Sequence, residues 1–374
     1  MNTLHQKIEQ EIRERGPIPF SRYMELCLYD PELGYYSRNA AQFGKAGDFY
    51  TSSDVHAVFG RLLARQFEEM WRLLGSPEHI TLRELGPGRG LFAQDVLDWS
   101  EIKFPDFFRA LHYLLDEQSA ALRKRIEITL SRHLESGKAA LQPGDDRGTP
   151  QIVFANEFFD ALPVEVASSQ GSLRIDTQRG RLIEVWAPSS TEELEFLDRY
   201  SVHPEAGERV EVLLQAEAHM NAAAFLERGF VVVIDYGYTR EEQLAGRHRG
   251  TLKAIRQHSL SANPYEAPGE QDITADVNFT ALAAAVEERG MLPQKLITQS
   301  QFLLGIGETT QFADAFQECR LPQERAKVAL QLKHLVTPAG MGESFHVLAA
   351  SKGIEAEKAG AMAGLNFGAT ARRG

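Results

Sequence analysis

Apolar side chains recur at helical spacing over the first part of the chain. Over residues 4–15 they fall on every fourth position, which places them on one face of an α-helix. The same spacing predicts a short helix over residues 22–29 and a longer one that begins at Ser53 or Asp54 and ends near Leu74. The pattern therefore predicts a helical segment at this end of the chain, interrupted by a loop rich in Gly, Ser and Thr.

From residue 80 the pattern changes to short apolar runs that alternate with amphipathic stretches. Apolar runs of this length are typical of strands buried on both faces of a mainly parallel sheet, and the stretches between them of covering helices. The sequence therefore predicts the α/β fold class. The principal runs span residues 80–85, 110–115, 151–155 and 230–234, and weaker strand candidates lie at 139–141, 294–299 and 345–349.

Two stretches do not fit a simple alternation of strands and helices. Residues 164–229 contain alternating patterns and a helix, and residues 239–279 are polar and rich in turns. We interpret both as insertions that form a cap over the carboxyl ends of the strands. The expected segments are an N-terminal helical or lid segment (1–79), the first half of the sheet (80–163), a cap insertion (164–229), the second half of the sheet with its insertion (230–353) and a frayed tail (354–374).

Composition and charge narrow the class of protein. The chain has 374 residues, a net charge of −12 and two cysteines. A negatively charged chain is not typical of a nucleic-acid binder, and two distant cysteines form neither a disulfide framework nor a zinc cluster. The apolar runs are too short to cross a bilayer, and the first residues lack the features of a signal or transit peptide. We therefore expect a cytoplasmic protein with no nucleic-acid partner and no membrane insertion.

The strongest motif is ELGPGRG at residues 84–90, where a predicted strand meets a predicted helix. Glycines at such a turn let a ligand approach the backbone closely. The spacing of Gly86, Gly88 and Gly90 departs from the dinucleotide fingerprint, which has two residues between its second and third glycines. With the acid Glu84 ahead of the turn, this spacing favours S-adenosyl-L-methionine (SAM), which is cationic and has no pyrophosphate, over NAD. The alternative is a turn with a structural role only.

Acidic residues stand at the ends of other predicted strands. Asp116 or Glu117 ends the second strand, where a carboxylate can accept both hydroxyls of a ribose, although an acid there can also serve a helix dipole. The third strand runs into NEFFDALP at residues 156–163, and another strand ends at Asp235. Ligands of an open parallel sheet bind beyond the carboxyl ends of its strands. These residues are therefore candidates for a reaction site, and the alternative is a polar turn with buried Phe side chains.

An ordered set of motifs carries a family resemblance. The set is DPELGYYS (30–37), FGKAGDFYTSS (43–53), FGRLLA (59–64), ELGPGRG (84–90), NEFFDALP (156–163), IDYGY (234–238) and GTLKAIRQHSLSANPYEAPGEQDITADVNF (250–279). Together these motifs resemble the MidA-like family of class I SAM-dependent methyltransferases over roughly residues 15–350. The resemblance implies a Rossmann-like sheet of seven strands with an inserted cap, and SAM as cofactor. The mitochondrial members of that family are complex I assembly factors that methylate an arginine on a core subunit.

The resemblance also implies roles for individual residues. It selects Glu117 over Asp116 as the acid of the second strand, and it matches the N-E pair and the following acid of the family to NEFFDALP. The chain departs from the family at Ser53, where a Pro is usual, and at Ser119-Ala120, where Ser-Pro is frequent. The cofactor-binding residues implied are Gly47, Asp48, Thr51, Glu84, Gly86, Gly88, Gly90, Glu117 and Asn156.

Methyl transfer to arginine sets requirements on the reaction site. The pKa of arginine exceeds about 12, so the site must orient the guanidinium and accept a proton as the new bond forms. Carboxylates suit both tasks, because their fork matches a guanidinium, and aromatic rings can stack on its plane. The catalytic candidates are Glu157 and Asp160, with Asp235 behind them, and the candidates for stacking are Phe158, Phe159 and Tyr236.

The partner and two alternative functions stay open from the sequence alone. The expected partner is a protein that presents an arginine, such as a subunit of a respiratory complex, and a homodimer is compatible with the sequence. The histidines show no spacing typical of metal ligands, so we expect no metal site. Two alternatives are a methyltransferase that acts on a small molecule and an assembly or binding module that retains a SAM fold without turnover.

Overall fold

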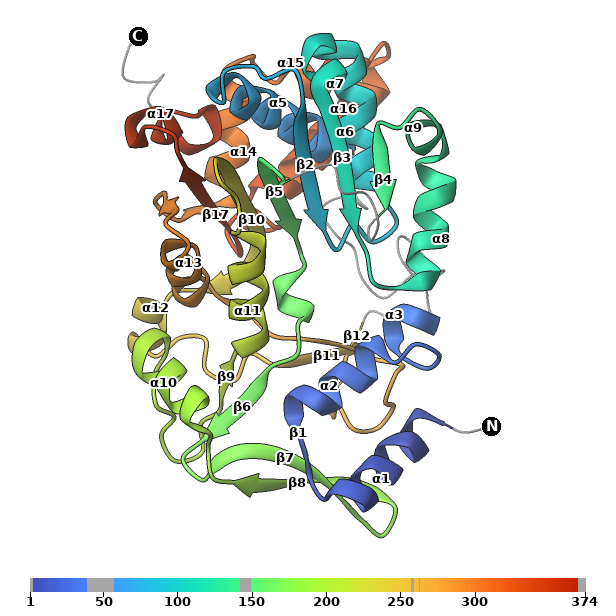
Figure 1. Ribbon diagram of the computed structural model, residues 1–374, viewed down its shortest axis with the longest axis vertical. Coiled ribbons are helices and arrows are strands. Elements are labelled where there is room, and N and C mark those ends of the chain that lie inside the picture. The colour runs from blue at the N-terminus through green and yellow to red at the C-terminus, as the bar shows by residue number, and fades with distance from the viewer. Residues whose placement is uncertain (1–2, 39–56, 142–148, 257–258, 262, 369–374) are drawn as a thin grey trace.

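The computed structural model describes residues 3–38, 57–141, 149–256, 259–261 and 263–368. Figure 1 shows a large sheet with helices on both faces in the upper part of the molecule, and a cap of smaller sheets and helices in the lower part. Strands β2, β3 and β5 run downward in this view, so their carboxyl ends face the cap.

The large sheet contains the predicted series of seven strands. Neighbouring strands pair in parallel from β4 through β3, β2 and β5 to β10, whereas β17 pairs antiparallel with β10 on one side and β15 on the other. Two short strands, β14 (Val277–Asn278) and β16 (Ile297–Thr298), pair with β10 and β17. In order across the sheet the strands are β15 (Leu292–Pro293), β17 (Phe345–Lys352), β10 (Gly229–Tyr238), β5 (Ile152–Asn156), β2 (Ile80–Leu85), β3 (Leu111–Asp116) and β4 (Ala139–Leu141).

Side chains alternate between two apolar faces of this sheet. Along β5, Ile152 and Phe154 belong to one core and Val153 and Ala155 to the other. A strand that is buried on both faces has an unbroken run of apolar residues. For this reason these strands have no alternation of apolar and polar residues in the sequence. The first core includes side chains of α5 (Ala57–Leu73), α6 (Leu91–Lys103), α7 (Pro105–Ala110), α14 (Gln299–Glu308), α15 (Ala313–Phe316) and α16 (Pro322–Val336), and the second those of α11 (Leu214–Ala223) and α13 (Phe279–Glu288).

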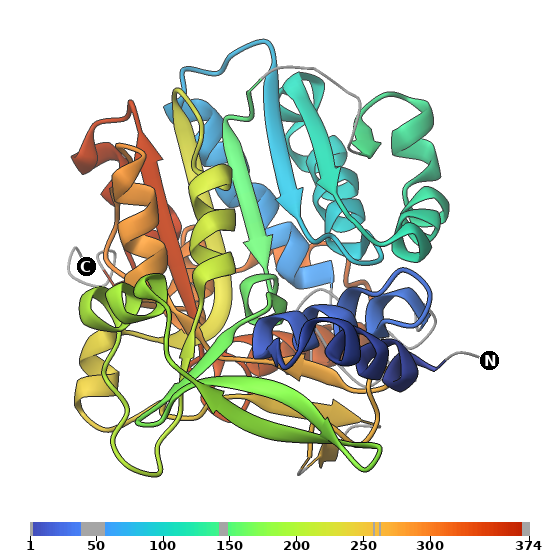
Figure 2. The same ribbon diagram turned by 60° about the horizontal axis from the view of Figure 1, so that its bottom comes forward.

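The cap joins the N-terminal helices to both of the predicted insertions. The buried side chains of α1 belong to the same core as those of α11 and α13, so the cap and the sheet share one hydrophobic core. Figure 2 shows α1 and α2 alongside the ribbon of β7 and β8. The helices are α1 (Leu4–Arg15), α2 (Phe20–Tyr29), α3 (Tyr35–Arg38), α10 (Thr191–Tyr200) and α12 (Arg240–Leu244). One sheet has the order β1 (Ile18–Pro19), β7 (Gly171–Gln178), β6 (Glu165–Ser168) and β9 (Val210–Val212), with β8 (Arg181–Ala187) on β7, and the other the order β12 (Ser259–Ser261), β11 (Lys253–Arg256) and β13 (Asp272–Thr274).

The end of the described chain corrects one expectation. Residues 354–374 were expected to fray, but α17 (Ala356–Gly360) and η2 (Ala363–Leu365) lie within this stretch. Ala359 and Met362 are buried in the core around α14. Gly305 of α14 permits this packing, because a Cβ at that position would lie 2.4 Å from the carbonyl oxygen of Ala363. Gly364 of the stretch itself is also closely packed, because a Cβ there would lie 2.4 Å from Cε2 of Phe302.

Two further findings concern the surface. Within the described ranges, no helix combines the length and the apolar character needed to cross a membrane.

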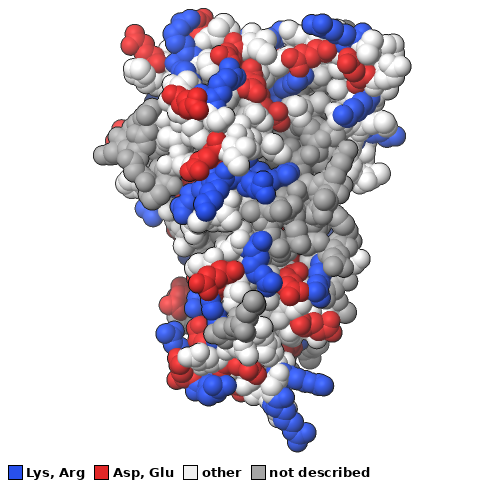
Figure 3. All heavy atoms as spheres, turned by 90° about the vertical axis from the view of Figure 1, so that its right-hand side faces the viewer, with Lys and Arg blue, Asp and Glu red and all other residues white. Residues whose placement is uncertain are grey.

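Figure 3 shows the face with α8 (Ala120–Thr129) and α9 (Ser131–Glu135), where acidic and basic side chains are intermixed and a group of Lys and Arg lies near mid-height. On this face the visible acidic side chains therefore alternate with basic ones.

Candidate active site

A cavity of about 400 Å³ opens where the carboxyl ends of β2, β3 and β5 meet the cap. The glycine turn after β2, the acids after β3 and the NEFFDALP loop after β5 all contribute to its lining. The cap contributes side chains from α2, α3, α11 and β13. The structure therefore brings together motifs that are up to about 240 residues apart in the sequence, from residue 36 to residue 272.

The three glycines of the turn have different surroundings. All three have positive φ, at 63° for Gly86, 55° for Gly88 and 77° for Gly90, which side chains other than glycine rarely adopt. Gly86 and Gly88 line the cavity, and a Cβ on Gly86 would lie 2.6 Å from Cδ2 of Phe158. Gly90 does not line the cavity, and a Cβ there would lie 3.3 Å from Leu130 and 3.4 Å from Ile126. Its role in cofactor binding stays a prediction.

Glu84 is a buried carboxyl in the floor of the cavity. Its side chain accepts a hydrogen bond of 2.8 Å from the hydroxyl of Tyr113. Burial raises the pKa of Glu84 to about 8, and the negative charge of Glu117 acts in the same direction. A cation bound nearby would stabilise the charged form of this carboxyl.

The two acids that follow β3 differ in their partners. Asp116 forms an ion pair with Arg83, the residue opposite Leu114 on the neighbouring strand. Glu117 accepts a hydrogen bond of 2.8 Å from the backbone N–H of Ser119. Burial raises the pKa of Glu117 to about 7. Both acids line the cavity, but the Asp116 carboxylate already has a cationic partner.

The loop after β5 places two acids at the cavity. Asn156 donates to Oε1 of Glu157 at 3.2 Å, and Oδ1 of Asn156 has no hydrogen-bond partner among the described residues. Glu157 has a φ of 50°, so the backbone turns sharply at this residue. Asp160 is 4% exposed, yet its side chain lines the cavity and accepts a hydrogen bond of 2.6 Å from the Tyr236 hydroxyl. Burial raises the pKa of Asp160 to about 6.

Asp235 lies behind this loop, the place in which the sequence led us to expect it, and it does not line the cavity. Its catalytic role stays a prediction. Asp235 is fully buried, and its Oδ2 accepts hydrogen bonds from the backbone N–H groups of Phe158, Phe159 and Asp160 at 3.2, 3.0 and 3.3 Å. Burial and the neighbouring charges of Asp160 and Glu157 raise the pKa of Asp235. Asp235 therefore shapes the loop that carries the two acids at the cavity.

The predicted aromatic residues also separate into two groups. Phe158 lines the cavity, whereas Phe159 is buried in the core and Tyr236 reaches Asp160 from behind the loop. Gly47, Asp48 and Thr51, which were expected to bind the cofactor, lie outside the described residues.

Sequence reasoning missed the residues that the cap contributes. Tyr29 and Tyr36 line the cavity, and their hydroxyls donate to the carbonyl oxygen of Ala161 at 2.9 Å and to Oδ1 of Asp272 at 3.0 Å. His219 also lines the cavity, with its ring 5.9 Å from that of Phe158. Tyr36 and Asp272 lie inside motifs of the resemblance, but nothing in their spacing indicated that they meet.

Metal chemistry has no support in the part of the chain that is described. No group of three or more His, Cys, Asp or Glu side chains there could hold a metal ion. The acids at the cavity hydrogen-bond instead to tyrosine hydroxyls and backbone N–H groups.

Comparison with known proteins gives consistent matches. Residues 62–297 match the model of a family described as S-adenosyl-L-methionine-dependent methyltransferases. The protein arginine methyltransferase NDUFAF7, mitochondrial, of Homo sapiens is 30% identical, over 91% of this chain and 81% of that protein. Its Drosophila melanogaster homolog is 29% identical, over 94% and 85%. A crystal structure from Burkholderia thailandensis with bound S-adenosyl-homocysteine matches with a TM-score of 0.83 and 29% identity, over 96% of this chain and 94% of that one.

The same comparison corrects the expected location. The sequence led us to expect a cytoplasmic protein, but these curated relatives are named as mitochondrial proteins. The expectation of a cytoplasmic protein is therefore wrong. It rested on the first residues of the sequence, in which we recognised no features of a signal or transit peptide.

Proposed function

The chain belongs to the family of S-adenosyl-L-methionine-dependent methyltransferases, and we propose that it methylates an arginine side chain of a protein substrate. The predictions of the family, the fold class, the enzyme class and SAM as cofactor are thereby confirmed. The names of the curated relatives and the acidic residues that line the cavity both support an arginine acceptor.

The residues at the sheet edge suit SAM. The cavity of about 400 Å³ falls within the roughly 300–1,000 Å³ of typical small-molecule sites. Nothing lies within 4 Å of the place where a Cβ of Gly88 would stand, so the backbone there is open to a ligand. We propose that Glu117 accepts the ribose hydroxyls, and that the Oδ1 of Asn156, which lacks a partner among described residues, accepts a further donor of the cofactor. When bound, SAM supplies a methyl group on a positively charged sulfonium.

The observation that carries the proposed acceptor is the buried carboxyl of Asp160 at the cavity. Its pKa of about 6 leaves it mostly ionised near neutral pH, so it can bind a guanidinium and accept a proton. In the proposed step a guanidinium nitrogen forms a bond to the methyl carbon as the carbon–sulfur bond breaks. The proton on that nitrogen passes to Asp160, and methylarginine and S-adenosyl-homocysteine remain.

Labelled SAM tests this function directly. The purified chain is incubated with methyl-labelled SAM and a lysate of the same organism, and labelled proteins are digested and analysed by mass spectrometry. We expect the label on arginine, and none when Asp160→Asn replaces the wild-type chain. A label on another side chain or only on a small molecule would overturn the arginine assignment. Binding of SAM without any transfer would favour a binding or assembly module.

Two narrower proposals follow from the family resemblance. One is that the acceptor is a subunit of a respiratory complex, which mass spectrometry of that complex tests by comparing cells with and without the chain. The loss of one methylarginine is expected. The other is a homodimer, which light scattering tests by measuring the mass in solution against 41.8 kDa for one chain. A value near that mass would exclude the homodimer.

A further inference from the structure

We propose that Asp272, on the cap strand β13, is the carboxylate that selects a guanidinium as the methyl acceptor. This inference rests on the proposed arginine methylation and assigns its specificity to a residue outside the sheet. Asp272 lies 112 residues beyond Asp160 in the chain, but both side chains line the same cavity. The backbone N–H of Ala275, three residues after Asp272, donates to the carbonyl oxygen of Asp160 at 3.0 Å. The two acids therefore belong to directly bonded segments.

The immediate surroundings of Asp272 suit a planar cation. Asp272 is 4% exposed. Its Oδ1 accepts a hydrogen bond of 3.0 Å from the Tyr36 hydroxyl. The rings of Tyr29 and Tyr36 lie 5.5 Å apart beside it. The charges of Asp160 and Asp272 both raise the pKa of Tyr29, which indicates that its hydroxyl lies near the two acids. A guanidinium could pair with the carboxylate edge-on and lie against an aromatic face.

The distribution of charge around the cavity supports the same conclusion. Carboxylates outnumber arginines in the described lining, and both arginines, Arg83 and Arg89, lie on β2 or in the turn that follows it. Arg83 already pairs with Asp116. The described lining residues that the cap contributes include Glu25 and Asp272 but neither lysine nor arginine. Glu25 forms an ion pair with Arg22 at 2.7 Å. The described lining at this end of the cavity is therefore acidic, which favours a cationic acceptor over a neutral or anionic one.

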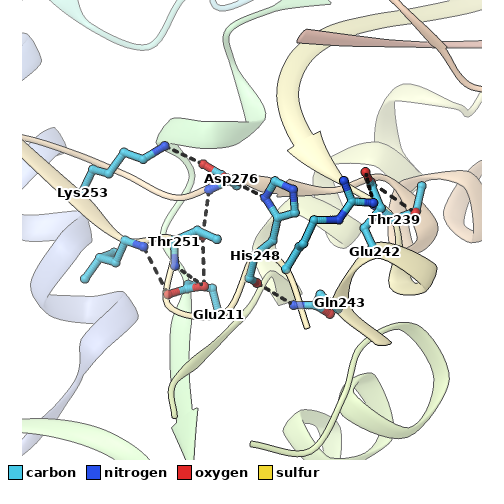
Figure 4. A network of polar contacts seen from close by, with 10 residues as sticks. Glu211, Thr239, Glu242, Gln243, His248, Thr251, Lys253 and Asp276 are labelled. Carbon is cyan, nitrogen blue, oxygen red and sulfur yellow. Dashed lines mark hydrogen bonds and ion pairs between the residues drawn. The ribbon is translucent and has the colours of Figure 1, made fainter. Parts of the chain in front are cut away.

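A polar network outside the cavity holds the segment that carries Asp272. Figure 4 shows Asp276 between two cationic or titratable groups, with Nζ of Lys253 at 2.8 Å and Nδ1 of His248 at 3.1 Å. The N–H of Asp276 donates to Oγ1 of Thr251 at 3.1 Å, and Thr251 donates to the buried Glu211 at 3.1 and 3.0 Å. None of these five residues lines the cavity. The network therefore anchors the backbone just beyond β13, four residues after Asp272.

Three peptides that differ at one side chain test the assignment. Each has a single central arginine, citrulline or lysine between neutral residues, and calorimetry measures its affinity for the full chain saturated with S-adenosyl-homocysteine. Citrulline keeps the shape of arginine without its charge, and lysine keeps the charge without the planar fork. We expect the wild-type chain to bind the arginine peptide about 10-fold to 100-fold more tightly than the citrulline peptide.

Variants then assign the preference to one carboxylate. Asp272→Asn should reduce the preference for arginine over citrulline to less than about threefold. Tyr36→Phe should reduce this preference only in part, because the lost hydrogen bond to Asp272 is expected to change affinity by about two- to tenfold. The matched control is Glu270→Gln, two residues away, whose carboxylate pairs with Arg256 outside the cavity. SAM affinity should stay within about twofold of wild type in all three variants, which also shows that they fold.

Each outcome decides one question. A wild-type chain that binds arginine and citrulline peptides equally, or an Asp272→Asn variant that keeps the wild-type preference, would overturn the role of Asp272. A Tyr36→Phe variant that loses the preference while Asp272→Asn keeps it would assign selection to the tyrosine instead. Failure of the proposed function has a different signature, because the labelled methyl group would then appear on a residue other than arginine in the lysate assay.

Discussion

The two ends of the cavity are built in different ways. The end at the sheet edge uses segments that each follow a strand, and Gly86 and Gly88 are part of its lining. The end at the cap uses side chains from four separate elements, among them Tyr36 and Asp272. Backbone groups at a glycine turn suit a cofactor that is the same in every reaction of the family. Side chains on inserted elements can instead differ from one acceptor to another. We therefore expect residues at the sheet edge to bind the cofactor and residues of the cap to select the acceptor.

Changes to Asp160 should give the largest effect and separate the two ends most clearly. Loss of the proposed proton acceptor in Asp160→Asn should lower turnover roughly 10²- to 10⁴-fold. SAM affinity should change little, because Asp160, although it follows β5, is bonded to the cap segment through the N–H of Ala275 at 3.0 Å. Single-turnover kinetics with labelled SAM measures the first quantity and calorimetry the second. A variant with weakened SAM binding and normal turnover would contradict the division of the cavity.

Glu117→Gln should give the next largest effect, at the cofactor end. Hydrogen bonds to a charged group contribute about 1.5–3 kcal/mol, so SAM affinity should fall roughly 10- to 100-fold. The matched change is Asp116→Asn, which removes the partner of Arg83 and should weaken SAM binding less. Calorimetry on both variants identifies the acid that binds the ribose. A larger loss in Asp116→Asn would transfer that role to Asp116.

Gly86→Ala tests whether the turn must be glycine. The new Cβ would lie 2.6 Å from Phe158 and would sit at a φ of 63°, so Phe158 must move into the cavity. We expect SAM affinity to fall about tenfold, since strain of this kind costs roughly 1–3 kcal/mol. The control is Gly137→Ala, with a φ of 71° and no atom within 4 Å of its Cβ. That variant should lose a similar amount of stability in thermal unfolding but keep its SAM affinity.

The pH dependence of turnover should give the smallest effect. Only the ionised form of Asp160 can accept a proton, and its pKa is about 6. Turnover should therefore rise as the pH increases through about 6 and then level off. At about one pH unit below the pKa it should be about tenfold lower than at this plateau. Tyr236→Phe removes the hydroxyl that stabilises the carboxylate, so the midpoint should move to higher pH. A midpoint that is unchanged in this variant would show that another group controls the profile.

Local patterns in the sequence were sufficient to predict many elements. The strand at β2 (Ile80–Leu85) was predicted with its observed bounds, because an apolar run followed by a glycine turn has few other interpretations. The stretch that follows β3 forms two helices, α8 and α9, separated at Leu130, and hydrophobic spacing alone does not reveal such a one-residue break. The tail was misjudged for a related reason: its small residues pack against Gly305, which lies about 55 residues earlier in the chain.

The sequence by itself determined the sheet, the glycine turn and the acids that follow the strands, because each of these depends on neighbours within a few residues. It could not show that Gly90 faces α8 or that Asp235 bonds the backbone of the loop, since the direction of a side chain depends on distant packing. The meeting of Tyr36, Asp160 and Asp272 was decided only by the tertiary structure. It requires the cap to fold over the sheet edge, and the buried core shared by the two parts supplies the free energy for that arrangement.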